Sequence, residues 1–304
     1  MPRATRPLAE ALARTTARRA LVLDGGLSNQ LADQGCDLSD ELWSGRVLAD
    51  RPEQVAAAHT AYARAGAQVL ITASYQVGYA AFARHGYGAP RTTALLHRSV
   101  RLADRAARAA DHDVWVAASV GPYGAVLADG SEYRGRYGLS AGELADFHRP
   151  RIRALLAAGP DVLALETVPD TVETEALLRV LAETGARAWL SYTVAGGRTR
   201  AGQPLPEAFE LAARAPGVIA VGVNCCDPED VLPALEAAAR VTGKPLLAYP
   251  NDGSVWEAAT RTWHAPAVRV PWPTAAWRRA GARLLGGCCR VGPSRIAELA
   301  ATGC

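Results

Sequence analysis

The sequence has few lysines, few cysteines and no long apolar run, and each shortage excludes a class of protein. Lys244 is the only lysine among 304 residues and the formal net charge is +3 at pH 7, which argues against nucleic acid as a partner. No apolar run reaches the ~18 residues of a membrane-spanning helix, so we expect no membrane span. Six cysteines are too sparse for a secreted disulfide framework, which favours reduced thiols in a cytoplasmic protein.

The N-terminal stretch, residues 1–20, is rich in arginine and faintly resembles a transit peptide. It has no continuous apolar segment, however, and it contains Glu10. We therefore expect it to form a first helix of the folded protein.

Short apolar segments alternate along the chain with longer amphipathic ones, which is typical of repeated strand–helix units. Eight segments rich in Val, Leu, Ile and Ala are predicted to be strands: Ala20–Leu23, Gln68–Thr72, Val114–Ser119, Val162–Glu166, Ala188–Tyr192, Val218–Asn224, Leu246–Tyr249 and Arg283–Gly286. Helices are predicted between them, among them Pro52–Ala65, Thr92–Ala110, Ala141–Ala158, Thr171–Thr184, Pro228–Val241 and Pro293–Ala300.

Eight such units without a linker predict an α/β fold, a single (β/α)8 TIM barrel domain over residues 1–304. A doubly wound open sheet is the alternative, because a count of strands does not show that the sheet closes. In a barrel the active site forms at the carboxyl ends of the strands. The polar and metal-binding residues at the predicted strand ends are expected to converge on one mouth: Asp24, Ser74, Tyr75, Ser119, Glu166, Tyr192, Thr193, Asn224, Cys225, Tyr249, Asn251, Cys288 and Cys289.

Three of these strand-end residues are cysteines. Cys225 follows the sixth predicted strand, and the adjacent pair Cys288 and Cys289 follows the eighth; adjacent cysteines rarely bridge each other because the ring strains the peptide between them. Three thiolates leave one corner of a tetrahedral zinc ion open, which is typical of a catalytic site. Gly286 and Gly287 are predicted to give the backbone freedom to aim both side chains at one ion. The alternative is that the thiols are unreactive core residues.

Several segments resemble the homocysteine S-methyltransferase family: GVNCC, LLAYPNDG and GARLLGGCCR, with LVLDGGLSNQL, LSDELWSGRVL and AGAQVLITASYQ, over about residues 20–300. The pattern is most similar to the S-methylmethionine-type enzymes of that family. The resemblance implies a (β/α)8 barrel with one Zn²⁺ per chain, held by Cys225, Cys288 and Cys289. Cys226 stands where relatives commonly carry another residue, and we expect it to be a bystander.

The resemblance also implies a reaction, the transfer of a methyl group from S-methylmethionine or S-adenosylmethionine to the thiol of homocysteine, which forms methionine. A free thiol is mostly protonated at neutral pH, and coordination to zinc favours the nucleophilic thiolate. Asp24 and Glu166, the acidic strand-end residues, are predicted to bind the substrate ammonium, with Asn224 beside them in the substrate site. The backbone N–H groups of the turn Gly25, Gly26, Leu27 and Ser28 are predicted to bind the carboxylate; the alternative is a tight turn with Asp24 as a helix cap.

An aromatic face binds soft cations such as a sulfonium. Trp43 and Tyr75 are the predicted walls of the donor site and Trp263 is a third candidate, with simple packing as the alternative for each. The segment Trp256–Trp272 is rich in Pro and Trp, and it is long enough to form a lid over the mouth or a rigid surface loop.

Other functions are compatible with these residues. The same barrel could use betaine as donor, or selenocysteine or selenohomocysteine as acceptor, whereas a methylated corrin is disfavoured because no cobalamin or folate module follows the barrel. The other class is a non-catalytic zinc or thiol sensor, which would bind metal tightly without turnover. The sequence predicts no oligomeric state, and it assigns no role to Cys36 or Cys304.

Overall fold

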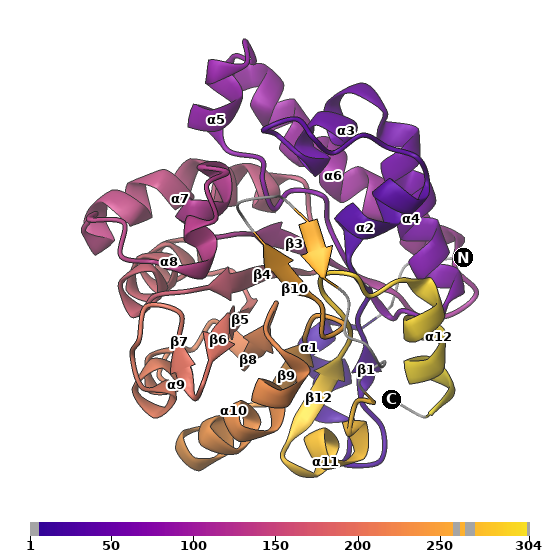
Figure 1. Cartoon of the computed structure of the whole chain (residues 1–304), viewed down its shortest axis with the longest axis vertical. Helices are drawn as coiled ribbons and strands as arrows, with labels where there is room; N and C mark the ends of the chain where they lie inside the picture. The colour runs from indigo at the N-terminus through magenta and orange to yellow at the C-terminus, as the bar shows by residue number, and fades with distance from the viewer. Residues whose placement is uncertain (1–5, 258–261, 265–270, 303–304) are drawn as a thin grey trace.

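Eight parallel strands form the centre of the protein (Figure 1). The computed structural model describes residues 6–257, 262–264 and 271–302. In the order in which they pair, the strands are β1 (Leu21–Val22), β12 (Ala282–Leu285), β9 (Leu246–Tyr249), β8 (Val218–Asn224), β5 (Ala188–Tyr192), β4 (Val162–Val168), β3 (Trp115–Val120) and β2 (Val69–Ile71).

The sheet closes on itself because β1 also lies against β2. Leu23 forms a parallel bridge with Val69, and Asp24 N donates to Val69 O at 3.0 Å. The predicted barrel is therefore confirmed, and the doubly wound open sheet is wrong. All eight predicted strands are present, β5, β8 and β9 with the predicted bounds.

Helices surround the barrel (Figure 1). They are α1 (Leu8–Ala13), α2 (Leu27–Asp33), α3 (Ser44–Asp50), α4 (Pro52–Arg64), α5 (Tyr79–Arg84), α6 (Ala89–Ala109), α7 (Ala141–Ala157), α8 (Thr171–Thr184), α9 (Leu205–Ala213), α10 (Pro228–Val241), α11 (Thr274–Arg279) and α12 (Pro293–Ala301), with two 3₁₀ turns, η1 (Tyr123–Val126) and η2 (Ser131–Tyr133). The six helices named from the sequence are present as α4, α6, α7, α8, α10 and α12. In the described part of the chain no helix is long and apolar enough to cross a membrane.

Local sequence fixes where the helices begin after the strands. Ser140 and Glu143 form a capping box at the start of α7, in which each side chain accepts a hydrogen bond from the backbone of the other. Asp170 caps α8 by accepting from Val172 N at 3.0 Å. These caps end the loops that leave β3 and β4, and so they limit how far those loops extend over the barrel.

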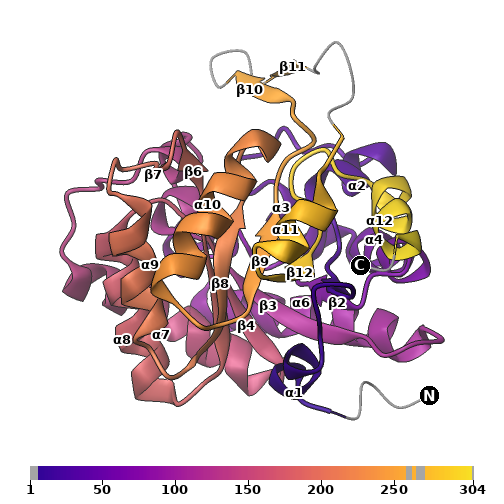
Figure 2. The same ribbon diagram turned by 90° about the horizontal axis from the view of Figure 1, so that it is seen from below.

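The barrel is closed at one end by α1. Leu8 and Leu12 of this helix are buried with side chains that point into the barrel from the strands, and Trp115 Nε1 donates to Arg6 O at 2.7 Å. Figure 2 shows α1 at the end of the barrel opposite to β10 and β11. The N-terminal stretch therefore contains the expected helix, and that helix fills the end of the barrel at which the strands begin.

Two short hairpins stand outside the barrel. One pairs β6 (Val194–Ala195) with β7 (Arg198–Thr199), and the other pairs β10 (Val255–Glu257) with β11 (Thr262–His264). The second hairpin belongs to the segment predicted as a lid and lies at the end where the strands finish (Figure 2). Residues 258–261 and 265–270 lie outside the described residues, and closure of this segment over the mouth stays a prediction.

A candidate metal and substrate site at the barrel mouth

Three thiols meet where β8 and β12 end. The Sγ atoms of Cys225, Cys288 and Cys289 all lie within 4.8 Å of one another, and those of Cys225 and Cys289 are 3.5 Å apart. A tetrahedral ion with metal–sulfur bonds of about 2.3 Å would hold its sulfur ligands about 3.8 Å apart. The predicted convergence of the three cysteines is confirmed, and their spacing fits a metal ion.

The ionisation of the three thiols also fits a metal site. Hydrogen bonds from Cys225 and Cys288 lower the pKa of Cys289 well below its usual value, whereas the hydrogen bond between Cys288 and Cys225 raises the pKa of Cys288. The cluster alone thus favours one thiolate stabilised by two thiols, because three adjacent negative charges repel. A divalent cation would offset that repulsion and allow all three sulfurs to act as thiolate ligands.

The glycines before the cysteine pair are required by space. A Cβ on Gly287 would lie 2.1 Å from Val291 Cγ1, and one on Gly286 would lie 2.5 Å from Leu23 Cβ. Neither glycine has φ in the left-handed region. Close packing against neighbouring segments is therefore the reason that the structure shows for these glycines, and a left-handed φ is not part of it.

Cys225 itself is the residue with the unusual backbone. Its φ is +49°, a left-handed conformation that costs a non-glycine residue about 1–3 kcal/mol. Thr193 Oγ1 donates to Cys225 O at 3.0 Å, and Tyr133 Oη lies 3.1 Å from Cys225 Sγ. These contacts hold the strained residue so that its thiol points to the other two.

Glu166 lies in an irregular part of β4. The register of β4 against β5 shifts between Leu165 and Val168, and such bulges redirect side chains. One carboxylate oxygen of Glu166 accepts from Ser119 Oγ and the other from Tyr249 Oη at 3.0 Å. Burial raises the pKa of Glu166 to about 7, although both hydrogen bonds oppose this shift.

Asn224 connects this bulge to the thiols. Its Oδ1 accepts from Thr167 N and its Nδ2 donates to Thr167 Oγ1, both at 2.7 Å, and Thr167 has a φ of +59°. Asn224 therefore ties Glu166, which precedes Thr167, to Cys225, which follows Asn224. The predicted contact of Asn224 with substrate stays a prediction.

Asp24 is buried with one oxygen unpaired. Its Oδ2 accepts from Ile71 N at 2.8 Å, whereas its Oδ1 has no hydrogen-bond partner among the described residues. Burial raises the pKa of Asp24 well above its usual value, and the nearby Glu166 adds to the shift. No side chain caps α2, whose N-cap is Gly26, so the alternative of Asp24 as a helix cap is wrong.

Gly25 and Gly26 pack against the segment after the cysteine pair. A Cβ on Gly25 would lie 2.2 Å from Val291 O, and one on Gly26 would lie 2.5 Å from Cys288 O. Gly26 N already donates to Val291 O at 2.9 Å. The Gly26 N–H is therefore already used within the protein, and the predicted binding of a carboxylate by this turn stays a prediction.

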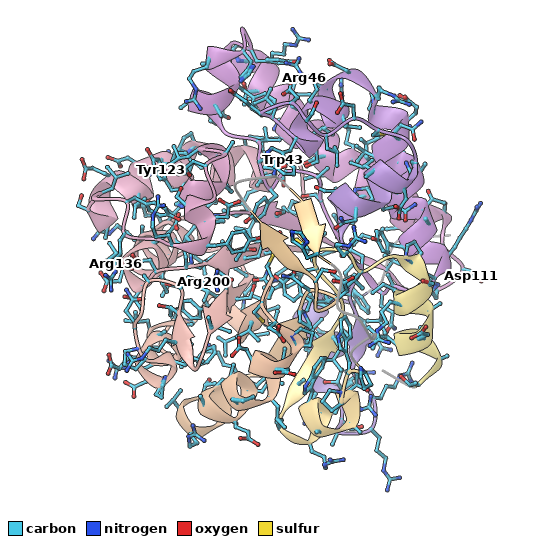
Figure 3. All side chains as sticks on the ribbon, in the orientation of Figure 1. Trp43, Arg46, Asp111, Tyr123, Arg136 and Arg200 are labelled. Carbon is cyan, nitrogen blue, oxygen red and sulfur yellow. The ribbon has the colours of Figure 1, made fainter. Side chains whose placement is uncertain are left out.

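The two predicted aromatic walls come from different loops. Tyr75 follows β2 and packs against Gly121, on which a Cβ would lie 2.7 Å from the tyrosine ring. Trp43 precedes α3, is half-buried and has a φ of +47°; Figure 3 shows it on the α3 side of the barrel. Their contacts with a donor stay predictions, and the side chain of Trp263 lies outside the described residues.

One strand-end residue points away from the mouth. Tyr192 Oη donates to Ala208 O at 2.7 Å and accepts from Thr174 Oγ1 at 3.0 Å, so its side chain packs between the barrel and the outer helices α8 and α9. Successive residues of a strand point to opposite faces, and Tyr192 falls on the outer face. The expectation that every such residue reaches the mouth is wrong here.

Two residues near the thiols were not predicted, Glu132 and Tyr133 of η2. Tyr133 contacts Cys225, as described above, and Glu132 Oε2 is buried without a hydrogen-bond partner among the described residues. Burial raises the pKa of Glu132 to about 7, and the Cys225 thiol adds to the shift. The sequence signal was slight, an acidic and an aromatic residue side by side in the loop DGSEYRGRYG that follows the third strand.

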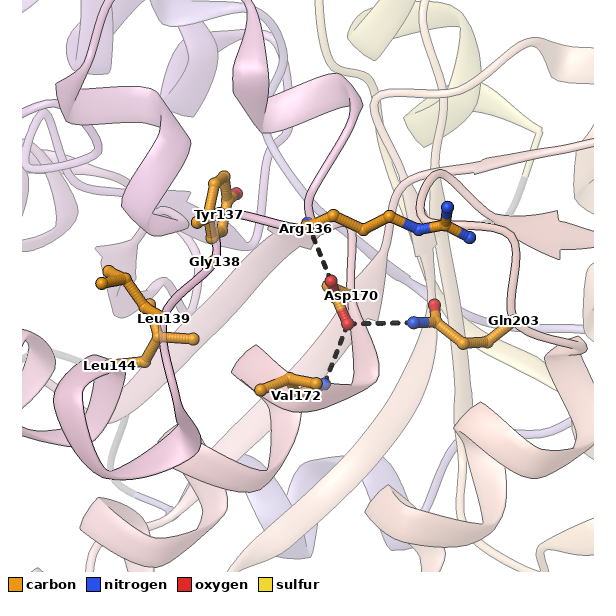
Figure 4. Close-up of a pocket in the computed structure, with 8 residues that line it drawn as sticks. All are labelled: Arg136, Tyr137, Gly138, Leu139, Leu144, Asp170, Val172 and Gln203. Atoms are coloured by element: carbon orange, nitrogen blue, oxygen red, sulfur yellow. Dashed lines mark hydrogen bonds between the residues drawn. The ribbon is translucent and has the colours of Figure 1, made fainter.

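A separate pocket of about 350 Å³ lies between this loop and the start of α8 (Figure 4). Asp170 accepts three hydrogen bonds there, from Arg136 N at 2.9 Å, Val172 N at 3.0 Å and Gln203 Nε2 at 2.9 Å. Both oxygens of this carboxylate are therefore used in holding the loops together. The lining residues include none of the predicted site residues: Arg136, Tyr137, Gly138, Leu139, Leu144, Asp170, Val172 and Gln203.

Comparison with known proteins gives consistent matches. The family model described as Homocysteine S-methyltransferase matches residues 21–302. The Homocysteine S-methyltransferase of Escherichia coli strain K12 is 45% identical over 292 residues, which cover 92% of this chain and 94% of the relative. Homocysteine S-methyltransferase YbgG of Bacillus subtilis strain 168 is 40% identical, covering 92% and 93%. The crystal structure of the E. coli homocysteine methyltransferase MmuM in its metallated form is similar with a TM-score of 0.85 at 42% identity, covering 97% of this chain and 99% of that one.

Proposed function

The chain belongs to the homocysteine S-methyltransferase family, and from this premise we propose that it transfers a methyl group from a sulfonium, S-methylmethionine or S-adenosylmethionine, to the thiol of L-homocysteine. The product is methionine. The observation that carries the proposal is the group formed by Cys225, Cys288 and Cys289, whose Sγ atoms lie within 4.8 Å of one another at the barrel mouth.

Zinc is the metal that this donor set favours. Three thiolate ligands suit zinc, and when bound it supplies an open coordination position at which a substrate thiol ionises. The similar E. coli enzyme has a metallated form, which supports a metal at Cys225, Cys288 and Cys289.

The amino-acid head of homocysteine lies against two acidic residues, Asp24 after β1 and Glu166 in β4. Asp24 Oδ1 is a buried acceptor without a donor in the described part of the protein, and an ammonium group would pair with it. The carboxylate of Glu166 is kept in place by Ser119 and Tyr249, so it can share the same ammonium without having to reorganise. Holding the head group in this way orients the substrate sulfur toward the thiol cluster.

Methyl transfer is an in-line displacement at carbon. The substrate thiol releases its proton to solvent water, its sulfur forms a bond to the methyl carbon, and the bond from that carbon to the donor sulfur breaks. The electron pair of the broken bond returns to the donor sulfur, which becomes a neutral thioether. The protein needs no acid or base at the methyl group, and Trp43 and Tyr75 assist by presenting aromatic faces to the donor cation.

The direct test is methionine formation by the purified, zinc-loaded and reduced protein. Homocysteine is the acceptor, and S-methylmethionine, S-adenosylmethionine and betaine are compared as donors in parallel. We expect turnover with a sulfonium. If verified zinc-loaded protein formed no methionine with any of the three donors, the proposed function would be wrong and a non-catalytic sensor would be favoured.

A further inference from the structure

We propose that the loop between β3 and α7 binds the methyl donor, and that the Glu132 carboxylate receives the α-ammonium group of an amino-acid donor such as S-methylmethionine. The inference rests on the proposed function and assigns the donor to one side of the mouth. It also gives a role to a residue that the sequence did not single out.

Glu132 offers a buried acceptor that the fold leaves unpaired. Its Oε2 atom is shielded from solvent and has no hydrogen-bond partner among the described residues. Leaving such an oxygen without a donor costs about 1–3 kcal/mol or more, so it marks a place for a group that arrives from outside. An ammonium group has three N–H donors, whereas a sulfonium sulfur has none. The ammonium is therefore the part of the donor that suits Glu132.

The loop is built to keep Glu132 in place. A Cβ on Gly124 would lie 2.4 Å from Glu132 N, so η1 and η2 are in direct backbone contact. On the other side of the residue, Arg200 Nε donates to Tyr133 O at 3.1 Å. The backbone at Glu132 is thus held by the packing of the loop on both sides.

Buried charged side chains hold the base of the same loop. Glu173 Oε1 accepts from Tyr123 N at 2.6 Å, and Arg151 Nη2 donates to Gly121 O at 2.7 Å. Glu173 and Arg151 are 0% and 1% exposed. Ion-assisted hydrogen bonds of this kind are strong in a dry interior, so the loop is anchored where it leaves β3.

Glu132 lies in the electrostatic field of the thiols. Burial and then Glu132 raise the pKa of the Tyr75 hydroxyl, and Glu132 also acts on the Cys289 thiol. The hydroxyl of Tyr133, the next residue, contacts Cys225 Sγ. A cation at Glu132 would therefore lie near the thiols, and the neighbouring Tyr75 and Tyr133 offer aromatic faces for the sulfonium.

Two amino-acid substrates require two ammonium sites, and two of the described carboxylates at the mouth each leave one buried oxygen without a hydrogen-bond partner. Asp24 Oδ1 is the second such oxygen. Asp24 interacts with Glu166, whereas Glu132 belongs to the loop after β3; the Cys225 thiol acts on both Glu166 and Glu132. One carboxylate thus serves the homocysteine side of the mouth and the other serves the donor side, with the thiols near both.

This assignment has a consequence for donor choice. Betaine carries a quaternary nitrogen without an N–H group, so it cannot donate to Glu132 and leaves the oxygen unpaired. A site that is built to form a buried hydrogen bond strongly rejects a ligand that cannot form it. Amino-acid donors are therefore preferred over betaine.

The test is Glu132→Gln, which keeps the shape of the side chain and removes its charge. The Kd for S-methylmethionine, measured by calorimetry on the zinc-loaded protein, and its KM should both rise about 10- to 100-fold. The KM for homocysteine should change by less than about twofold. Dimethylsulfoniopropionate is a sulfonium without an ammonium group, so its inhibition constant against S-methylmethionine should also change by less than about twofold. Undetectable binding of S-methylmethionine to the wild type, or an unchanged Kd in the variant, would overturn the inference.

Asp129→Asn is the matched control. Asp129 is exposed in the same loop, and its Oδ1 accepts from Ser131 N at 2.9 Å, a bond that Asn can keep. Donor affinity should be unchanged. An equal loss of donor affinity in Glu132→Gln and Asp129→Asn would mean that both changes disturb the fold of the loop. The proposed contact between the Glu132 carboxylate and the donor would then be wrong. Absence of turnover in the wild type would instead contradict the proposed function, and calorimetry would still test donor binding.

Discussion

The two ends of the barrel are built on opposite principles. Where the strands begin, α1 inserts Leu8 and Leu12 among apolar side chains, and the end is dry and densely packed. Where the strands finish, Asp24 and Glu132 carry buried oxygens without partners among the described residues. The first end contributes to stability, whereas the second leaves polar groups unsatisfied in the protein alone and so prepares them for ligands.

Backbone strain follows the same division. The non-glycine residues described with positive φ lie in the last residues of a strand or in the segments that follow it: Trp43, Ala128, Arg136, Thr167, Cys225 and Arg290. Strain at functional sites persists only where the surrounding structure enforces it. The contrast between the ends therefore predicts that substitutions at one will change function and substitutions at the other will change stability.

The largest effect is expected on metal binding and turnover, from the loss of a metal ligand at the barrel mouth. Cys288→Ser should abolish metal binding and reduce turnover about a thousandfold or more, roughly 4 kcal/mol, because a zinc ligand is lost. Metal content by atomic absorption and methionine formation should fall together. Cys226→Ala is the control, since Cys226 is buried beside Cys225 but outside the three-thiol group, and it should keep both. Activity without metal in Cys288→Ser would end the proposed zinc-thiolate chemistry.

The next largest effect is expected on stability, from a substitution in α1 at the end where the strands begin. Leu12 is 3% exposed, and Leu12→Ala should lower the free energy of unfolding by about 2–4 kcal/mol with little change in kcat or KM at 25 °C. Chemical denaturation measures the first and steady-state kinetics the second. Ala11→Ser, on the same helix, should lower the free energy of unfolding by much less. A large fall in kcat for folded Leu12→Ala would contradict the division between the ends.

A smaller effect is expected at Glu166. Glu166→Gln should raise the KM for homocysteine about 10- to 100-fold, because the charge that faces the ammonium is lost. The Kd for the methyl donor should stay close to that of the wild type, so the variant complements Glu132→Gln. A change in donor affinity equal to that in homocysteine affinity would show that the two carboxylates do not divide the substrates.

The smallest effect concerns pH. The pKa of Glu166 is raised from 4.5 to about 7 on folding, so between these values the folded protein binds more protons than the unfolded one and its stability falls as pH rises. The free energy of unfolding of Glu166→Gln relative to wild type should therefore rise by about 1–3 kcal/mol from pH 4.5 to 7 and then level off. Asp24 and Tyr249 face Glu166 and remain in both proteins. A difference that is constant with pH would contradict the raised pKa.

The sequence predicted the structure best where apolar residues recur in short runs along the chain. Apolar runs located all eight strands because a strand inside a barrel is buried along its whole length, and the rule that sites form at strand ends located the thiols. It was less informative about α2, α3, α5 and α11, which have only six or seven residues, too few for a helical period to stand out.

The remaining features that the sequence did not reveal arise from three-dimensional contacts. Gly286 is required because Leu23, which is far away in the sequence, packs against it, and Gly287 is required because Val291 does. No sequence motif announces either contact. Glu132 is notable only because the folded loop buries one of its oxygens without a partner in the described structure. No local pattern encodes such a burial, since it depends on how η1, η2 and the thiol segments pack together.

The position of α1 has a consequence for the order of folding. This helix is synthesised before all eight strands of the barrel, yet the cluster that buries Leu8 and Leu12 includes Leu284 of β12. The cluster is therefore complete only after β12 has joined the barrel, and such distant contacts form slowly. Until then this end of the barrel lacks one of the strands that cover α1, so we expect it to close late in folding.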